Sequence, residues 1–186
     1  MHKFTVWHRT AAAVCFAGLF AGASAEAFEL KSTDIAEGST LTNAQVFAGF
    51  GCTGENLSPA LQWSGAPAGT KSFAVTLYDP DAPTGSGWWH WIVYDLPAST
   101  SGLPRGIGKG AALPAGAHQG RNDFGTTDFG GACPPVGDKP HHYIFTIYAL
   151  KVDKLGVPAD ATAALIGFNI KANSLGSATL SARYGR

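Results

Sequence analysis

Apolar residues along this chain occur in short runs separated by glycine and proline, without the three- and four-residue spacing of long amphipathic helices. Residues 72–78 alternate large and small side chains, as a strand does. Residues 89–94 are aromatic and β-branched on both faces, which predicts a central strand covered on both sides, and residues 142–150 predict a third strand. The pattern therefore predicts a mostly β fold.

Weaker patterns complete the expected organisation. We expect further short strands at residues 40–41, 61–63 and 179–184. Residues 160–167 predict one short helix that begins at Asp160 and ends at Gly167, and residues 173–175 predict a further helical turn. The loop-rich stretch 97–138 is long enough to indicate function or additional short elements. No repeat or linker divides the chain, which predicts a single compact domain.

The first 25 residues have the features of a secretory signal peptide. Lys3 and Arg9 precede the small apolar run 11–20, and Ala23-Ser24-Ala25 has the form of a cleavage site. A membrane anchor is the alternative, but the run is short for a bilayer span of about 30 Å. We therefore expect a leader at residues 1–25, a mature domain at 26–186, and a periplasmic or secreted protein with no integral membrane segment after cleavage.

The charge of the expected mature chain is nearly balanced. Loss of the leader's two basic residues changes the balance of basic to acidic residues from 13 against 13 to 11 against 13. Such a surface lacks the positive charge that binding to nucleic acid or an anionic membrane needs.

Two cysteines, Cys52 and Cys133, remain in the expected mature chain. In an oxidising compartment two remaining cysteines most simply pair, and the closed loop would contribute about 4 kcal/mol at most. Two separate buried thiols are the alternative.

The segment Asp79-Pro80-Asp81-Ala82-Pro83 holds two carboxylates on a loop that proline stiffens. Both aspartates could simply cap local backbone N–H groups. His90 follows in a strongly apolar run, and a buried imidazole needs partners for both ring nitrogens. Asp79 or Asp81 would provide one such partner; a backbone carbonyl would be the ordinary alternative.

A second segment, Gly131–Gly137, combines close backbone approach at Gly131 with the rigid pair Pro134-Pro135. Free backbone N–H groups near Gly131 would hold an anion. His141 and His142 open the next strand, so their side chains point to opposite faces. We expect His141 to face the cavity, because Tyr143 shares its face.

These segments resemble the phosphatidylethanolamine-binding protein family, and in particular its bacterial Raf-kinase-inhibitor-like branch of the YbhB and YbcL type. The resemblance runs from about Phe28 to the end. It includes Asn56-Leu57-Ser58-Pro59, Gly69–Thr76 and Gly120–Gly125. It implies a large central β-sheet packed on a smaller one, with short peripheral helices and an anion pocket at the sheet edge. Carried over by position, the pocket residues are Asp79, Asp81, His90, Gly131, Pro134, His141 and Tyr143.

The residues and the resemblance together predict a protein that binds a small anion such as phosphate, a phosphoethanolamine-like group or a carboxylate. We expect no catalysis and no cofactor, and a homodimer is possible. Three alternatives remain open: a protein-binding inhibitor module, a hydrolase, and a metal site. No Gly-x-Ser-x-Gly elbow supports a hydrolase, and Ser86 sits in an expected turn. The metal site would use His90, His141, Asp79 and Asp81.

Overall fold

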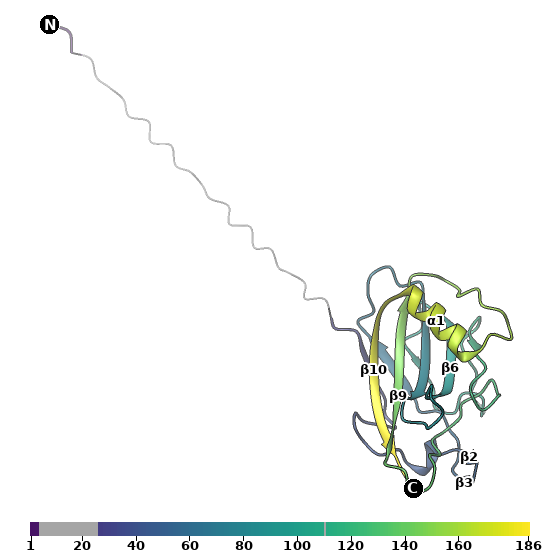
Figure 1. Ribbon diagram of the computed structural model, residues 1–186. Helices are drawn as coiled ribbons and strands as arrows, with labels where there is room; N and C mark the ends of the chain where they lie inside the picture. Colours follow the sequence, from purple (N-terminus) through teal and green to yellow (C-terminus); the bar gives the residue numbers. More distant parts are fainter. Residues whose placement is uncertain (4–25, 110) are drawn as a thin grey trace.

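A five-stranded antiparallel sheet forms the centre of the molecule (Figure 1). A computed structural model describes residues 1–3, 26–109 and 111–186 of the chain. The strand order of this sheet is β10-β9-β5-β6-β8. Its strands are β5 (Ser72–Asp79), β6 (Trp88–Pro97), β8 (His118–Gln119), β9 (His141–Leu150) and β10 (Ser174–Tyr184). The mostly β fold and the three main strands are confirmed.

Two smaller sheets complete the β-structure of the described residues. One consists of β1 (Glu29–Lys31), β4 (Leu61–Ser64) and β7 (Gly102–Leu103). The other is a hairpin of β2 (Ala48–Gly49) and β3 (Cys52–Thr53), which follows a 3-10 turn, η1 (Asn43–Gln45). Figure 1 shows this hairpin at the same end of the molecule as the C-terminal residues, far from helix α1.

The main core lies between the large sheet and the β1-β4-β7 sheet. Phe73, Val75 and Leu77 alternate along β5 and join Trp63 and Leu61 from β4 in one buried cluster. Alternation along a strand places every second side chain on one face, and the next residue on this face is Asp79. The polar end of an otherwise apolar strand face therefore points toward the edge of the core.

The other face of the large sheet is covered by α1 (Ala163–Asn173). Ile166 and Ile170 are buried there with Ile92 and Leu150. The side chain of Thr162, the N-cap, accepts a hydrogen bond from the N–H of Leu165. This second buried cluster contains fewer residues than the main core.

The helix does not end at Gly167, so that boundary prediction is wrong. Gly167 lies in the middle of α1, where a Cβ atom would lie 2.8 Å from the indole of Trp89. The glycine is therefore explained by close packing between the helix and β6 and not by termination. The expected helical turn at 173–175 is wrong as well, because β10 begins at Ser174 and pairs with β9.

The long connection 97–138 contains β7 and β8, in agreement with the expectation of additional short elements. The expected strand at 40–41 is reduced to one bridge, between Thr40 and Arg183. The expected leader falls largely on residues 4–25, which lie outside the described residues. Within the described part of the chain, no helix has the length and apolar character needed to cross a membrane.

Candidate ligand pocket

A cavity of about 220 Å³ lies where the ends of β5, β6 and β9 meet two proline-rich loops. Asp79, His90, His141 and Tyr143 provide its titratable groups. The other residues that line it are Phe50, Ala82, Pro83, Thr84, Trp88, Phe124, Cys133, Pro134 and Pro135. The structure therefore brings segments from four separate parts of the sequence around one hollow.

Asp79 is the central acid of this cavity and is 2% exposed. Its Oδ2 atom accepts a hydrogen bond of 2.7 Å from Nδ1 of His141, and lies 4.0 Å from Nε2 of His90. Its Oδ1 atom accepts a hydrogen bond from the N–H of Asp81. The carboxylate is thus both a local cap and the partner of a buried imidazole, which fixes its position between two histidines.

His90 reaches the cavity because β6 contains an irregularity at this residue. Leu77 pairs with Trp91 and Tyr78 pairs with Trp89, so the register passes over His90. An extra residue in one strand of an antiparallel pair changes the direction in which a side chain points. His90 consequently faces the pocket, although Trp89 and Trp91 face opposite cores.

The His90 ring is oriented by backbone carbonyls. Its Nδ1 atom lies 2.9 Å from the oxygen of Gly130 and 3.2 Å from that of Gly131. Carbonyl oxygens only accept, so Nδ1 carries a hydrogen and Nε2 is the nitrogen left for the cavity. Burial lowers the pKa of His90 to about 4. The hydrogen bonds to Gly130 and Gly131 and the charge of Asp79 raise this pKa, but burial outweighs them. At neutral pH the imidazole is therefore uncharged.

His141 and His142 lie on opposite faces of β9, as strand alternation requires. His141 is buried against Asp79, and its Nε2 atom lies 3.4 Å from Oδ2 of Asp138. Both the side chain and the backbone N–H of His142 donate to Oδ2 of Asp81, each at 2.7 Å. His142 and Asp81 do not line the cavity.

Asp81 therefore differs from the expectation that both aspartates belong to the pocket. Its side chain is 42% exposed, and it orients His142 on the outer face. Partial burial raises the pKa of Asp81, but the hydrogen bonds from the backbone and side chain of His142 outweigh it and leave the pKa below its ordinary value. The turn at Pro80 separates the two carboxylates, because only Asp79 continues the inward face of β5.

Gly131 also lies outside the lining. A Cβ atom on Gly131 would lie 2.2 Å from the carbonyl oxygen of Gln45, so the close approach is to protein backbone and not to a ligand. Its N–H donates to Oδ1 of Asn56 at 2.7 Å and is not free to bind an anion. Gly131 contributes through its carbonyl, which helps to orient His90.

Two hydrogen-bond donors at the cavity have no partner among the described residues. They are the hydroxyl of Tyr143 and Nε1 of Trp88. Burial, with the charge of Asp79, raises the pKa of Tyr143 far above its usual value, so the hydroxyl keeps its hydrogen. The backbone of Cys133 acts in the opposite direction and lowers the pKa of Tyr143, although it does not form a hydrogen bond with the hydroxyl. Buried donors of this kind normally find an acceptor.

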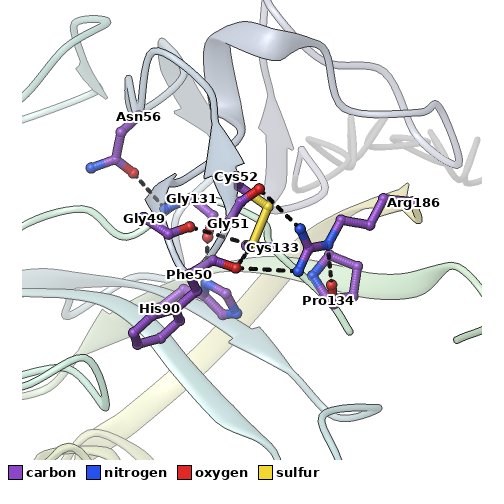
Figure 2. Close-up of a disulfide and its surroundings, with 10 residues drawn as sticks. All are labelled: Gly49, Phe50, Gly51, Cys52, Asn56, His90, Gly131, Cys133, Pro134 and Arg186. Carbon is purple, nitrogen blue, oxygen red and sulfur yellow. Dashed lines mark hydrogen bonds between the residues drawn. A yellow bond between two sulfur atoms is a disulfide. The ribbon is translucent and has the colours of Figure 1, made fainter. Parts of the chain in front are cut away.

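The expected disulfide between Cys52 and Cys133 is confirmed (Figure 2). The two Cα atoms are 6.0 Å apart, and the bond joins residues separated by 81 positions in the sequence. Cys133 lines the cavity, so the bond attaches the second proline-rich loop to the β2–β3 hairpin beside the pocket.

The molecule also has a larger hollow of about 560 Å³ over the β1-β4-β7 sheet. The charged residues Glu29 and Lys31 that line it are exposed and form an ion pair with each other. Buried titratable groups are instead concentrated in the smaller cavity, which makes that cavity the better candidate for ligand chemistry.

The sequence matches the family model for phosphatidylethanolamine-binding protein over residues 31–185. The chain belongs to the phosphatidylethanolamine-binding protein family. It is 56% identical to YbcL of Escherichia coli over 164 residues, which cover 87% of this chain and 90% of YbcL. It is 51% identical to YbhB of the same organism over 157 residues, which cover 84% of this chain and 99% of YbhB.

The fold agrees with this membership. The crystal structure of E. coli YbcL superposes with a TM-score of 0.82 at 53% identity, covering 86% of this chain and 98% of the YbcL chain. A further relative, LppC of Mycobacterium tuberculosis, is named a putative lipoprotein and is 42% identical over 115 residues, which cover 61% of this chain and 52% of LppC. The disulfide and this relative are compatible with a location outside the cytoplasm.

Sequence reasoning did not identify several residues of this family member's pocket. Phe124 was noted only within the Gly120–Gly125 motif, yet its ring lies 5.3 Å from the ring of His90 and 5.3 Å from that of Trp88. In the sequence, Phe124 is distinguished as a large aromatic residue in an otherwise small and polar motif, and Phe50 has no comparable signal.

Proposed function

We propose that the cavity binds a small oxyanion, either a phosphate monoester or a carboxylate, without breaking a bond in it. The observation that supports this most directly is the arrangement of groups around one hollow. Nε2 of His90, the hydroxyl of Tyr143 and the indole N–H of Trp88 surround it without hydrogen-bond partners, beside the fixed pair of Asp79 and His141. An oxyanion supplies the acceptor that the hydroxyl of Tyr143 and the indole N–H of Trp88 lack, and the one that Nε2 of His90 needs once it is protonated.

Proton uptake at His90 would make the binding of an anion favourable. The free pocket contains the carboxylate of Asp79, which repels an anion, and an imidazole whose pKa is lowered to about 4 by burial. A bound anion stabilises the imidazolium and so raises the pKa of His90. His90 would then lie between two negative groups, the ligand and Asp79. Affinity should therefore rise as the pH falls from neutral toward 4.

Binding without catalysis accounts for the lining better than hydrolysis does. The hydroxyl of Thr84 donates to the carbonyl of Gly87, and the sulfur of Cys133 is in a disulfide. Neither side chain is therefore available as a nucleophile activated by a neighbouring base. The alternative of a metal site also loses a ligand, because Asp81 is directed to His142. The described residues contain no group of three or more His, Cys, Asp or Glu side chains arranged to hold a metal ion.

The proposed setting is the periplasm or the exterior of the cell. The leader expected at residues 1–25 would direct export, and an oxidising compartment would maintain the bond between Cys52 and Cys133. Peptide mapping of the exported protein tests this: we expect a mature N-terminus after Ala25 and no alkylated cysteine.

Calorimetry with sulfate tests the proposed binding function. Sulfate keeps the same charge over the relevant range, so a change in its affinity between about pH 7.5 and about pH 5.5 reports titration of the protein. We expect tighter binding at the lower pH with uptake of protons. His90→Asn retains a donor at the position of Nδ1 but removes Nε2, and it should abolish binding.

The matched control is His142→Asn, which keeps the corresponding donor to Asp81 on the outer face. Unchanged sulfate binding is expected for this variant. Binding that strengthens with rising pH, or equal losses in the two variants, would contradict the proposal.

A second candidate function, a protein contact, is favoured by the outer face of α1. Leu165 and Phe168 are exposed on this helix, three residues apart and therefore on one face of it. Grouped apolar side chains on a surface mark interaction sites. We propose a second copy of the chain as the first partner to test. Light scattering of the wild type should show a dimer that Phe168→Ser dissociates; a monomeric wild type would reject this partner.

A further inference from the structure

The tip of the β2–β3 hairpin has an unfavourable residue for its conformation. Phe50 and Gly51 connect Gly49 to Cys52, and both have positive φ angles, 52° and 81°. Two-residue hairpin turns with two positive φ angles favour Asn-Gly or Gly-Gly sequences. A bulky aromatic residue in this conformation is an outlier, and such strain is often retained at functional sites. The hairpin alone does not explain why Phe50 stands here.

The position of the Phe50 side chain suggests an explanation. Phe50 lines the cavity, yet it is 68% exposed. Its ring lies 5.5 Å from that of Phe47 and 5.7 Å from that of Phe124. Phe124 in turn contacts His90 edge-on, with ring centres 5.3 Å apart. An apolar wall therefore runs from the polar floor of the pocket to a largely uncovered ring at its mouth.

Arg186 binds the backbone of the turn that carries this ring (Figure 2). Its Nη2 and Nη1 groups donate to the carbonyls of the two turn residues, Phe50 and Gly51, at 3.3 and 3.2 Å. Its Nε–H donates to the carbonyl of Pro134 at 2.7 Å. One guanidinium therefore joins the hairpin tip to the proline-rich loop, beside the disulfide that joins the same two segments.

We propose that Phe50 is a specificity-determining residue, which selects oxyanions that carry a flat apolar substituent, and that Arg186 is the positioning residue for Phe50. The proposal rests on the anion site described above and names its class of ligand. The oxyanion lies at His90 and Tyr143, and the substituent covers the exposed ring of Phe50. Contact with the ligand would bury the aromatic surface that the free protein exposes, which favours an aryl ester over a small alkyl ester.

The first test compares two probes, methyl phosphate and phenyl phosphate, which present similar head groups and differ in the substituent. We expect the wild type to bind phenyl phosphate about three- to tenfold more tightly, the range that one aromatic contact provides. Phe50→Asn removes the ring but suits the turn better, so it should fold at least as stably in urea. In this variant the affinity for phenyl phosphate should fall by more than that for methyl phosphate, so that the ratio of the two affinities approaches one.

The second test addresses Arg186. Arg186→Met keeps an apolar stem and removes the donors, and Arg186→Lys keeps the charge but cannot reach three carbonyls at once. Both variants should lose the phenyl preference and show faster amide exchange at residues 48–53, with unchanged affinity for methyl phosphate. If Arg186 had a purely structural role, its variants would show faster amide exchange but the same ratio of affinities for phenyl and methyl phosphate as the wild type.

The outcomes separate this proposal from the pocket itself. If the wild type binds methyl phosphate but shows no phenyl preference, or if Phe50→Asn retains the preference, the role of Phe50 is wrong and the anion site stands. If Phe50→Asn loses the preference and both Arg186 variants retain it, only the role of Arg186 is wrong. If the wild type binds neither probe, the anion site and the selection by Phe50 are both wrong.

Discussion

Two Asp–His pairs from the same two sequence segments have nearly the same geometry and very different surroundings. Asp79 with His141, and Asp81 with His142, each have a 2.7 Å hydrogen bond from Nδ1 to Oδ2. The side chains of the first pair are 3% and 4% exposed, and both side chains of the second are 42% exposed. Spacing in the sequence thus sets the pairing, but the face of the sheet decides whether a pair lies in a cavity or in water.

The largest expected difference between the pairs appears when each aspartate is replaced. Asp79→Asn replaces the charged acceptor of the buried hydrogen bond from His141 with a neutral one, and should lower the free energy of unfolding by up to about 3 kcal/mol. Asp81→Asn affects an exposed pair and should cost about 1 kcal/mol or less. Urea denaturation of the two variants at neutral pH measures this, and equal losses would mean that burial does not distinguish the pairs.

A second prediction concerns acid stability, to which buried His90 contributes. Its pKa is about 4 in the folded protein, against 6.5 as the ordinary value, so the unfolded state binds more protons between these pH values. Stability should therefore decrease as the pH falls from about 6.5 to about 4, by roughly 3 kcal/mol in all. Below that range His90 adds no further loss.

Thermal or urea unfolding of His90→Asn across this range should show a shallower loss than the wild type. His142→Asn, the exposed control, should retain the wild-type slope. An unchanged slope in His90→Asn would show that burial does not lower the pKa of His90.

The smallest predicted effect is the response of the two pairs to salt. Salt screens exposed charges strongly and buried charges weakly. The stability difference between wild type and Asp81→Asn should shrink by a few tenths of a kcal/mol between about 0.05 and 1 M sodium chloride. The corresponding difference for Asp79→Asn should stay constant, and a parallel decrease for both variants would contradict the contrast.

Much of this contrast could be predicted from the sequence, because strand alternation is a local rule. It places His141 and His142 on opposite faces of β9, and it places Asp79 on the same face as Leu77. The same rule does not apply to Asp81, which follows Pro80 and lies beyond the end of β5. The direction of its side chain depends on a neighbouring strand that local patterns do not specify.

Other features depend on contacts between distant segments and could not be predicted locally. Gly167 resembled a helix end, but it is required where α1 packs on Trp89. His90 enters the cavity through an irregularity in the pairing of β5 with β6, which no feature of the Trp-rich run indicates. Phe50 lies at the pocket because its hairpin is attached there by the disulfide of Cys52 and by the hydrogen bonds of Arg186. Both attachments join residues that are far apart in the sequence.

The central claim is that the buried histidines, and not the exposed one, receive an oxyanion. The most direct measurement is an imidazole nitrogen NMR titration of the wild type with sulfate at about pH 6.5, near the ordinary pKa of histidine. We predict that Nε2 of His90 becomes protonated as sulfate binds, that His141 shifts with it, and that His142 is unaffected. A shift confined to His142, or no shift of His90 at saturating sulfate, would contradict the account.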